Sequence, residues 1–359
     1  MFNELIEWLY SIFTPFRVFG YLTFRSAFAA LTTLLICFIF GGKIIEYLRK
    51  LKIGQSVRED GPKTHLVKSG TPTMGGILII MAVFTAMLFW GSLQNRFIWI
   101  TMGAFLAFGV IGFFDDYLKV TKRNSAGLPA WAKLAGQFVI AITIVLIIYF
   151  TGTEETTALY IPFFKDPVLD MGWLWIPFAV LLVVGESNAV NFSDGLDGLL
   201  AGLLIIVFLT LAVLTYITGR VDFSEYLGIP YIPEAGELTV FCLAAAGACV
   251  GFLWFNAHPA EVFMGDVGSL SLGGLIAVIS LITKKEILLL VIGGVFVLEI
   301  ASVIIQVVSF KLRGKRVFKM APLHHHYELM GWSETKTVIR FYILGGLFAI
   351  IALSTLKIQ

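Results

Sequence analysis

The sequence predicts an all-α integral membrane protein, a bundle of about ten transmembrane helices. The chain has 359 residues, of which 58% are hydrophobic and only 14% are charged, whereas soluble domains average roughly 45–50% and 25%. So few charged side chains cannot cover the surface of a water-soluble protein of this size. The composition therefore excludes a soluble globular domain, a disordered chain, a disulfide scaffold and a nucleic-acid-binding protein.

Ten apolar runs supply the expected spans, since a helix needs about 20 mostly apolar residues to cross a bilayer. The fifth run is short, and the first could begin upstream of residue 27. The ninth run is expected to be one span like the others. In chain order the runs cover residues 27–47, 72–91, 97–117, 131–150, 173–189, 197–218, 237–256, 267–283, 286–310 and 337–356.

The segment before the first span has its own apolar pattern. Leu5, Trp8, Leu9, Ile12 and Phe13 recur at helical spacing on one face. No basic stretch precedes them, as a signal peptide would require. We therefore expect residues 1–18 to form a helix that lies in the membrane interface.

Basic residues orient the bundle because they are concentrated in the odd-numbered connecting loops. By the positive-inside rule these loops are cytoplasmic and both termini face the exterior. The even loops at 151–172 and 219–236 are acidic and contain proline, so we expect periplasmic hairpins there, within a single polytopic domain over 1–359. The odd loops hold Arg49, Lys50, Lys52, Arg58, Lys63, Lys68, Lys119, Lys122, Arg123, Lys133, Lys311, Arg313, Lys315, Arg316, Lys319 and Lys336; the even loops hold Arg96, Lys165, Arg220, Lys284 and Lys285.

The first cytoplasmic loop ends in Lys68-Ser-Gly-Thr-Pro-Thr73-Met-Gly-Gly76 and runs directly into a span. A helix start with free amides and close-approaching glycines suits a phosphate. A plain helix cap followed by small packing residues fits equally well. The Gly-x-x-x-x-Gly-Lys-Ser/Thr motif does not occur in the sequence, which argues against ATP-driven work.

The third loop opens with Asp115 and Asp116 at the end of a span, with Lys119 one turn beyond Asp115. An uncompensated acid at the bilayer centre costs about 2.5–3.5 kcal/mol on insertion scales. Two adjacent acids at a helix end therefore favour a cation or a cationic network. The alternative is a solvated helix terminus.

The fifth and seventh loops carry acids and amides without any basic residue. Asn191, Asp194 and Asp197 lie among glycines in a pattern that lacks the spacing of an EF-hand. Asn256 and Asp266 follow in the seventh loop, where Asp266 could simply cap the next span. Cytoplasmic loops with acids but no bases run against the topological trend, which favours ligand binding over a merely solvated loop.

The ninth loop contains the consecutive residues His324, His325 and His326. Three adjacent imidazoles cannot easily converge on one metal ion, so we expect them to donate to phosphate oxygens; an inert surface run is the alternative. In the preceding span, Glu299 and Gln306 are seven residues apart and share a helix face. They could line a cleft or bond a neighbouring helix.

The chemistry of these loops points to one reaction class. Carboxylates and amide oxygens are the ligands that Mg²⁺ prefers, and lysines and imidazoles neutralise phosphoryl oxygens. Such a set at the membrane interface can join an amphiphilic phosphate to a water-soluble one. A transporter, the more distant alternative, would concentrate polar groups near the midplane on broken helices in repeated halves.

Five segments resemble the signature segments of the polyprenyl-phosphate N-acetylhexosamine-1-phosphate transferases. The match runs from about residue 40 to the end of the chain. The TPTMGG loop and the histidine triplet resemble the bacterial branch that acts on UDP-N-acetylmuramoyl-pentapeptide. The segments are KSGTPTMGG (68–76), FFDDYLK (113–119), NFSDGLDG (191–198), FMGDVG (263–268) and PLHHHYE (322–328).

The resemblance implies a reaction. Undecaprenyl phosphate would attack the β-phosphate of UDP-N-acetylmuramoyl-pentapeptide, releasing UMP and forming lipid I, the first membrane step of peptidoglycan synthesis. It also implies Mg²⁺ dependence, a homodimer, and a place in the bacterial cytoplasmic (inner) membrane with the active site facing the cytoplasm. The nearer alternative is a sister enzyme that uses UDP-N-acetylglucosamine, which we would expect to lack the histidine triplet.

The resemblance further implies roles for individual residues. Asp266 would ligate Mg²⁺, Asp115 and Asp116 would bind the metal or the lipid phosphate, and these three would be catalytic together with His324. The acceptor phosphate, with a second pKa near 6, is mostly dianionic at pH 7, which favours direct in-line attack; an aspartyl-phosphate on Asp115 or Asp116 stays open. The implied substrate-binding residues are Lys68, Thr73, Lys119, Lys133, Asn191, Asp194, Asp197, Asn256, Phe263 (stacking on uracil), Gln306, His325 and His326.

Overall fold

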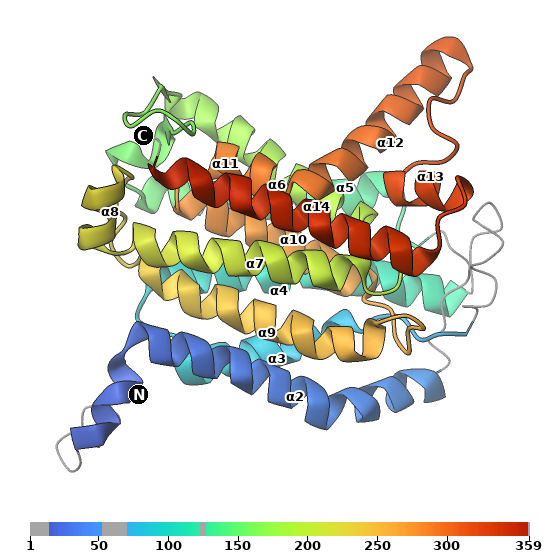
Figure 1. Cartoon of the computed structure of the whole chain (residues 1–359), viewed down its shortest axis with the longest axis horizontal. Coiled ribbons are helices and arrows are strands. Elements are labelled where there is room, and N and C mark those ends of the chain that lie inside the picture. Colours follow the sequence, from blue (N-terminus) through green and yellow to red (C-terminus); the bar gives the residue numbers. More distant parts are fainter. Residues whose placement is uncertain (1–13, 52–69, 123–126, 358–359) are drawn as a thin grey trace.

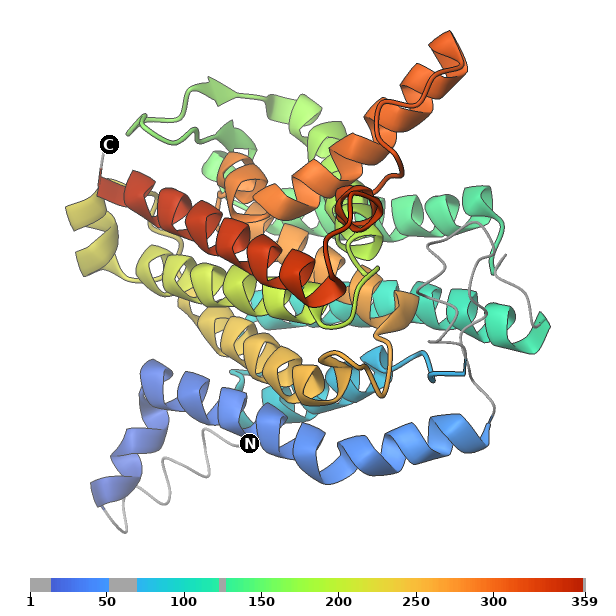
Figure 2. The same cartoon turned by 45° about the vertical axis from the view of Figure 1, so that its right-hand side comes forward.

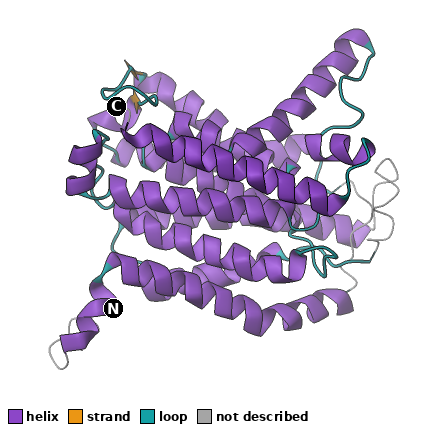
Figure 3. Ribbon diagram, viewed as in Figure 1, coloured by secondary structure: helices purple, strands orange, loops and turns teal. Residues whose placement is uncertain are grey.

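The computed structural model describes residues 14–51, 70–122 and 127–357, and almost all regular structure in these ranges is helical (Figure 1, Figure 3). The long helices run side by side along the molecule. Short 3-10 turns flank several of them. The helices are α2 (Leu22–Lys50), α3 (Gly76–Trp90), α4 (Arg96–Lys122), α5 (Ala130–Thr151), α6 (Trp175–Phe192), α7 (Leu199–Thr218), α8 (Val221–Leu227), α9 (Leu238–Asn256), α10 (Gly265–Ile282), α11 (Glu286–Ile292), α12 (Gly294–Arg313), α13 (Leu323–Leu329) and α14 (Glu334–Ser354).

The predicted helical membrane bundle is confirmed, because each of the ten apolar runs coincides with helix. Within the described ranges, nine helices are long and apolar enough to cross a membrane, and α3 is apolar but shorter. The predicted interfacial helix over 1–18 lies almost wholly outside the described residues; of that region, Thr14–Gly20 forms a 3-10 helix. The exterior placement of both termini stays a prediction.

The prediction of one continuous span over 286–310 is wrong, because the ninth run breaks into α11 and α12. The break falls at Gly293 and Gly294, which favour helix less than other residues in the run. A side chain at Gly294 would meet the ring of Phe348 in α14 at 2.8 Å, so the neighbouring helix approaches closely here. Beyond the break, α12 leans away from the other helices (Figure 2).

Helix α10 forms the centre of the bundle and is almost wholly buried. Its small residues let other helices approach its backbone, as is common between membrane helices. A Cβ atom at Gly273 would lie 2.8 Å from the Cα of Ser187 in α6, and one at Gly268 would lie 2.9 Å from the Cα of Gly76 in α3. Close packing against α3 and α6 therefore fixes the position of α10.

The loop at 151–172 contains the strand structure found within the described residues. Strand β1 (Ala158–Leu159) pairs antiparallel with β2 (Leu169–Asp170). The Lys284 ammonium donates to the carbonyl oxygen of Thr156 at 2.8 Å and ties this loop to the bundle. The all-α class is thus correct apart from this short ribbon, and α8 lies in the second loop, 219–236.

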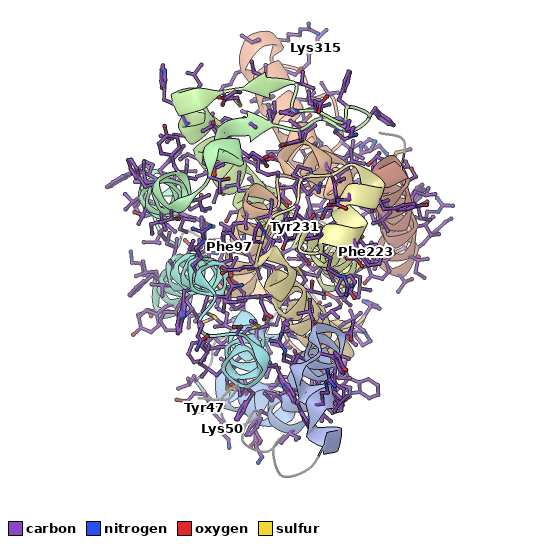
Figure 4. All side chains as sticks on the ribbon, turned by 90° about the vertical axis from the view of Figure 1, so that its left-hand side faces the viewer. Tyr47, Lys50, Phe97, Phe223, Tyr231 and Lys315 are labelled. Carbon is purple, nitrogen blue, oxygen red and sulfur yellow. The ribbon has the colours of Figure 1, made fainter. Side chains whose placement is uncertain are left out.

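The two ends of the bundle carry different features. The start of α2 and the end of α14 lie at the same end (Figure 1), which Figure 4 views directly, with Phe97, Phe223 and Tyr231 labelled. The end of α4, the end of α6 and the start of α10 lie at the opposite end (Figure 1). The residues predicted to act in catalysis come from that opposite end.

A buried ion pair joins α2 to the start of α9. The Arg25 guanidinium donates to both carboxylate oxygens of Glu237, at 2.8 and 2.5 Å, and to the carbonyl oxygen of Trp90 at 3.1 Å. The two charged side chains are only 9% and 18% exposed. Removing one partner of such a pair leaves an unpaired charge in a poorly hydrated place.

We expect Arg25→Ala to lower the free energy of unfolding by about 3 kcal/mol, because Glu237 would lose its bidentate partner. Arg220→Ala is the matched control, because the Arg220–Asp222 pair is exposed and its loss should change the stability much less. Denaturant unfolding of the purified protein in detergent micelles measures both values. Equal losses in the two variants would contradict the structural role of the buried pair.

Candidate active site

Three carboxylates, two of them buried and the third half-buried, meet where the end of α4 approaches the start of α10. Asp115 and Asp116 lie in the last turns of α4, and Asp266 is the second residue of α10. Oxygen atoms of all three lie within 4.8 Å of one another. We call Asp115, Asp116 and Asp266 the acid cluster. The predicted convergence of the third and seventh loops is therefore observed.

Two lysines neutralise the acid cluster. The Lys119 Nζ lies 2.5 Å from Asp115, 2.9 Å from Asp266 and 3.4 Å from Asp116. The Lys133 Nζ, from α5, lies 2.7 Å from Asp266 and 3.9 Å from Asp115. Buried charges are tolerated only when they are paired or ligate a metal ion, so the cationic network predicted for Asp115 and Asp116 is present.

Backbone amides hold the acids of α4 in fixed orientations. Asp115 accepts a hydrogen bond from the amide of Leu128 at 2.8 Å, and Asp116 accepts one from the amide of Val267 at 3.2 Å. The Val267 amide belongs to the first turn of α10, where unpaired N–H groups stabilise negative charge. Each of these two carboxylates thus has one oxygen committed to the backbone and one facing Lys119.

A close backbone contact sets the spacing of the acid cluster. A Cβ atom at Gly112 of α4 would lie 2.1 Å from the carbonyl oxygen of Asp266. Only glycine permits this approach, because any larger residue would push α4 and α10 apart. Gly112 is one turn before Asp115 and Asp116, so it determines how near they come to Asp266.

Asn191, near the end of α6, and Asp194, in the loop that follows, lie beside the acid cluster. The Asn191 amide donates to Asp266 and to the Ser269 hydroxyl, both at 2.7 Å. Asp194 accepts a hydrogen bond from the amide of Gly265, and burial raises the pKa of Asp194 to about 7. Both residues were predicted, and the structure places both beside Asp266.

The segment that ends the first cytoplasmic loop runs beside the start of α10. Phe263 donates its amide to Pro72 at 2.8 Å and accepts from Gly75 at 2.9 Å. A Cβ atom at Gly265 would lie 2.9 Å from the Thr73 hydroxyl. Thr73 and the Phe263 backbone therefore adjoin the acid cluster, whereas Lys68 lies outside the described residues.

Asp197 belongs to a different group of side chains. Its carboxylate accepts from His258 Nδ1 at 3.0 Å and from the Ala260 amide at 3.1 Å, and its own amide donates to Glu334 at 2.8 Å. Asn256 joins the same region, donating to the carbonyl oxygen of Val262 and accepting from the amide of Gly198. His258 and Glu334 were not predicted; the only sequence signal was a histidine beside the predicted residues of the seventh loop.

The three histidines have three different environments. His324 is fully buried, with Nδ1 3.2 Å from Glu299, and a Cβ atom at Gly195 would lie 2.1 Å from its Nε2. His325 contacts Glu328 at 2.9 Å, and His326 accepts from the amide of Lys319 at 3.1 Å. An inert surface run is therefore excluded for His324, which packs against the residue after Asp194.

Gln306 is engaged with the loop that precedes α13. Its amide oxygen accepts from Val317 and Phe318, both at 2.9 Å, and its amide nitrogen donates to the carbonyl oxygen of Phe318 at 3.0 Å. The structure thus places the side chain of Gln306 on the loop backbone and does not bring it to the acid cluster.

Known proteins match this chain over its whole length. A model of glycosyl transferase family 4 matches residues 97–284, and a phospho-N-acetylmuramoyl-pentapeptide-transferase signature matches residues 68–80. The phospho-N-acetylmuramoyl-pentapeptide-transferases of Thermodesulfovibrio yellowstonii and Desulfosudis oleivorans are 52% and 50% identical, each over 100% of both chains. The transferase of the same name from Koribacter versatilis is 52% identical over 97% of this chain and 96% of its own.

The chain belongs to the phospho-N-acetylmuramoyl-pentapeptide-transferase family. The family resemblance of the five loop segments is thereby confirmed, including the bacterial branch indicated by the TPTMGG loop. Membership also makes the chain a multi-pass membrane enzyme that transfers a phospho-sugar. In this member of the family, the acid cluster could hold a metal ion, because it gathers three carboxylates within ligand distance of one another.

Gly112→Ala tests whether the backbone contact controls the site. We expect the variant to lose about 1–3 kcal/mol of stability through overpacking and to lose most of its turnover, since α4 would move away from Asp266. Gly103→Ala is the control in the same helix, because a Cβ atom there meets no atom within 4 Å. Thermal unfolding and turnover are measured for both, and a Gly112→Ala enzyme with unchanged turnover would contradict the spacing role.

Proposed function

We propose that the protein transfers phospho-N-acetylmuramoyl-pentapeptide from UDP-N-acetylmuramoyl-pentapeptide to undecaprenyl phosphate, giving lipid I and UMP. Family membership supports the reaction, and one structural observation carries it for this chain. Three carboxylates and two lysines from three separate helices meet at one end of the bundle. That arrangement suits phosphoryl transfer, where catalysis depends on positioning and on neutralising charge.

Mg²⁺ fits the acid cluster as the cofactor. The cluster offers only carboxylate oxygens, the hard donors that Mg²⁺ prefers. Asp115, Asp116 and Asp266 would hold the ion. When bound, it supplies positive charge that stabilises the oxygens of the transferring phosphoryl group.

The lysines and Asn191 would act around this centre. Lys119 and Lys133 reach the same oxygen of Asp266, so both ammonium groups can neutralise phosphate oxygens that enter beside the acid cluster. Asn191 donates to the other oxygen of Asp266 and fixes the orientation of that carboxylate. His324, packed against Gly195, would support the substrate from the side of α13.

Direct in-line attack of the lipid phosphate on the β-phosphate accounts for this geometry. The attacking oxygen belongs to a mostly dianionic phosphate at pH 7 and needs no strong general base. Asp115 and Asp116 are 3% and 2% exposed, and each has one oxygen committed to a backbone amide. Such burial supports a role in holding charge and geometry, and it disfavours a nucleophile that must reach a phosphorus atom.

The nucleotide would bind along the loops next to the acid cluster. We assign Asp194, Asp197 and Asn256 to this contact, with Lys68, His325 and His326 as further predicted contacts. Phe263 is held by backbone hydrogen bonds to the 72–76 segment and remains partly accessible, so its ring can stack on uracil. Gln306 would contribute through the loop that it anchors rather than by direct contact.

The protein would work in the bacterial cytoplasmic membrane with its active site facing the cytoplasm. The basic residues of the odd loops support this orientation. The acid cluster, the histidines and the α6–α7 loop lie at the opposite end of the bundle from the described chain ends (Figure 1). We also infer a homodimer, on the resemblance alone; cross-linking in native membranes tests it.

Release of UMP tests the reaction directly. Purified protein with Mg²⁺ and undecaprenyl phosphate should release UMP from UDP-N-acetylmuramoyl-pentapeptide and not from UDP-N-acetylglucosamine. Asp266→Asn should lower the rate by more than the roughly 10–100-fold that loss of an outer-shell partner of a metal costs. The control is Asp222→Asn at an exposed ion pair, and a fully active Asp266→Asn enzyme would refute the metal role.

The uracil contact is tested by binding. Phe263→Ala should weaken UMP by about 0.5–1.5 kcal/mol, the usual value of an aromatic contact beyond its buried area. Phe263→Tyr keeps the ring and should bind UMP within about two-fold of the original protein. Calorimetry gives both affinities, and equal binding by the alanine variant would exclude stacking.

A further inference from the structure

A second group of metal-binding side chains lies outside the acid cluster. It consists of Asp197 from the α6–α7 loop, His258 from the α9–α10 loop and Glu334 from the first turn of α14. One ligand atom from each lies within 4.8 Å of the others. We call these three residues the histidine cluster.

The distances in the histidine cluster match those between the ligands of a four-coordinate ion. Zinc bonds of about 2.0–2.2 Å in a tetrahedron place neighbouring ligand atoms about 3.4 Å apart. His258 Nδ1 lies 3.0 Å from the Asp197 carboxylate and 3.6 Å from the Glu334 carboxylate. The three side chains therefore need little movement to face one ion, with a fourth position left for water.

In the histidine cluster, one side chain is open to solvent and the other two are held by hydrogen bonds to the backbone. Asp197 is 2% exposed, and its carboxylate is held by the Ala260 amide, while Glu334 accepts from the Asp197 amide. The His258 side chain is 43% exposed, so an ion can enter from solvent. A buried carboxylate positioned by backbone bonds next to an accessible imidazole is a preorganised half-site.

The donor atoms distinguish this cluster from the acid cluster. Three carboxylates suit a hard ion such as Mg²⁺, whereas one imidazole with two carboxylates suits a borderline ion such as Zn²⁺. The two sites should therefore take different ions from the same mixture. An imidazolium shared between the two carboxylates satisfies the same distances, and it predicts no metal binding.

We propose that Asp197, His258 and Glu334 form a second cation site for Zn²⁺ or a similar borderline ion, and that its occupancy inhibits the enzyme. The inhibition rests on the proposed function, because Asp197 is one of the residues assigned to the nucleotide. An ion there takes the Asp197 carboxylate and ties together two loops and the start of α14. The nucleotide donor then loses a contact, and its apparent KM rises.

Cobalt absorption tests the site without any substrate. The full-length protein in detergent, with saturating Mg²⁺, is titrated with Co²⁺, whose visible bands are intense in four-coordinate sites and weak in six-coordinate ones. We expect intense bands from the original protein, from Asp266→Asn and from Glu261→Gln, the matched control in the same loop. His258→Gln should lose them, and its Zn²⁺ affinity, measured against a chelator dye, should fall at least ten-fold.

Inhibition is measured by UMP release at saturating Mg²⁺. We expect Zn²⁺ to raise the KM for the nucleotide at least ten-fold in the original protein and in Glu261→Gln. The same Zn²⁺ concentration should leave the KM of His258→Gln unchanged. The proposed site would be overturned if the original protein gave no intense cobalt bands, or if the bands survived in His258→Gln. The proposed inhibition would be overturned if zinc bound without a change in KM. Absence of turnover with Mg²⁺ alone would instead contradict the proposed function, because the cobalt result does not depend on it.

Discussion

The need to neutralise three neighbouring carboxylates, two of them buried, governs the architecture of the active end. Asp115, Asp116 and Asp266 occupy the ends of two packed helices, where water screens their mutual repulsion less than it would at an exposed surface. The bundle meets this constraint with Lys119 from the same helix as two of the acids and with Lys133 from the next helix. Because the acids are already paired with cations, this end of the molecule is suited to a metal ion and to phosphate groups.

The acid cluster could be predicted from the sequence because each of its members lies at the end of an apolar run, where an acidic residue is unusual. An acid at the end of an apolar run is costly unless it has a partner, and the positive-inside rule put Asp115 and Asp266 on one side of the membrane. Helix ends on the same side of a bundle lie near one another, so these acids were expected to converge. The residue types of the site could thus be inferred from the sequence, whereas the distances between them required the structure.

Other features were hidden because they depend on the paths of loops. Asn256 and Gln306 contact backbone groups of irregular segments, and hydrophobic periodicity contains no information about where such segments run. His258 and Glu334 are far apart in the chain, so their meeting at Asp197 could not be inferred from spacing. The break between α11 and α12 falls within a run that is apolar throughout. Only two adjacent glycines distinguish this run from an ordinary span.

The departure of α12 from the bundle links the site to the lipid around it. Few of its side chains are buried, so most of its apolar surface is open to lipid, and a lipid-facing helix can tilt to match the hydrocarbon thickness. Glu299, beside His324, and Gln306, which anchors the loop before α13, are both carried by this helix. A thicker or thinner bilayer would therefore shift His324 relative to Gly195, making membrane composition a physical variable of the reaction centre.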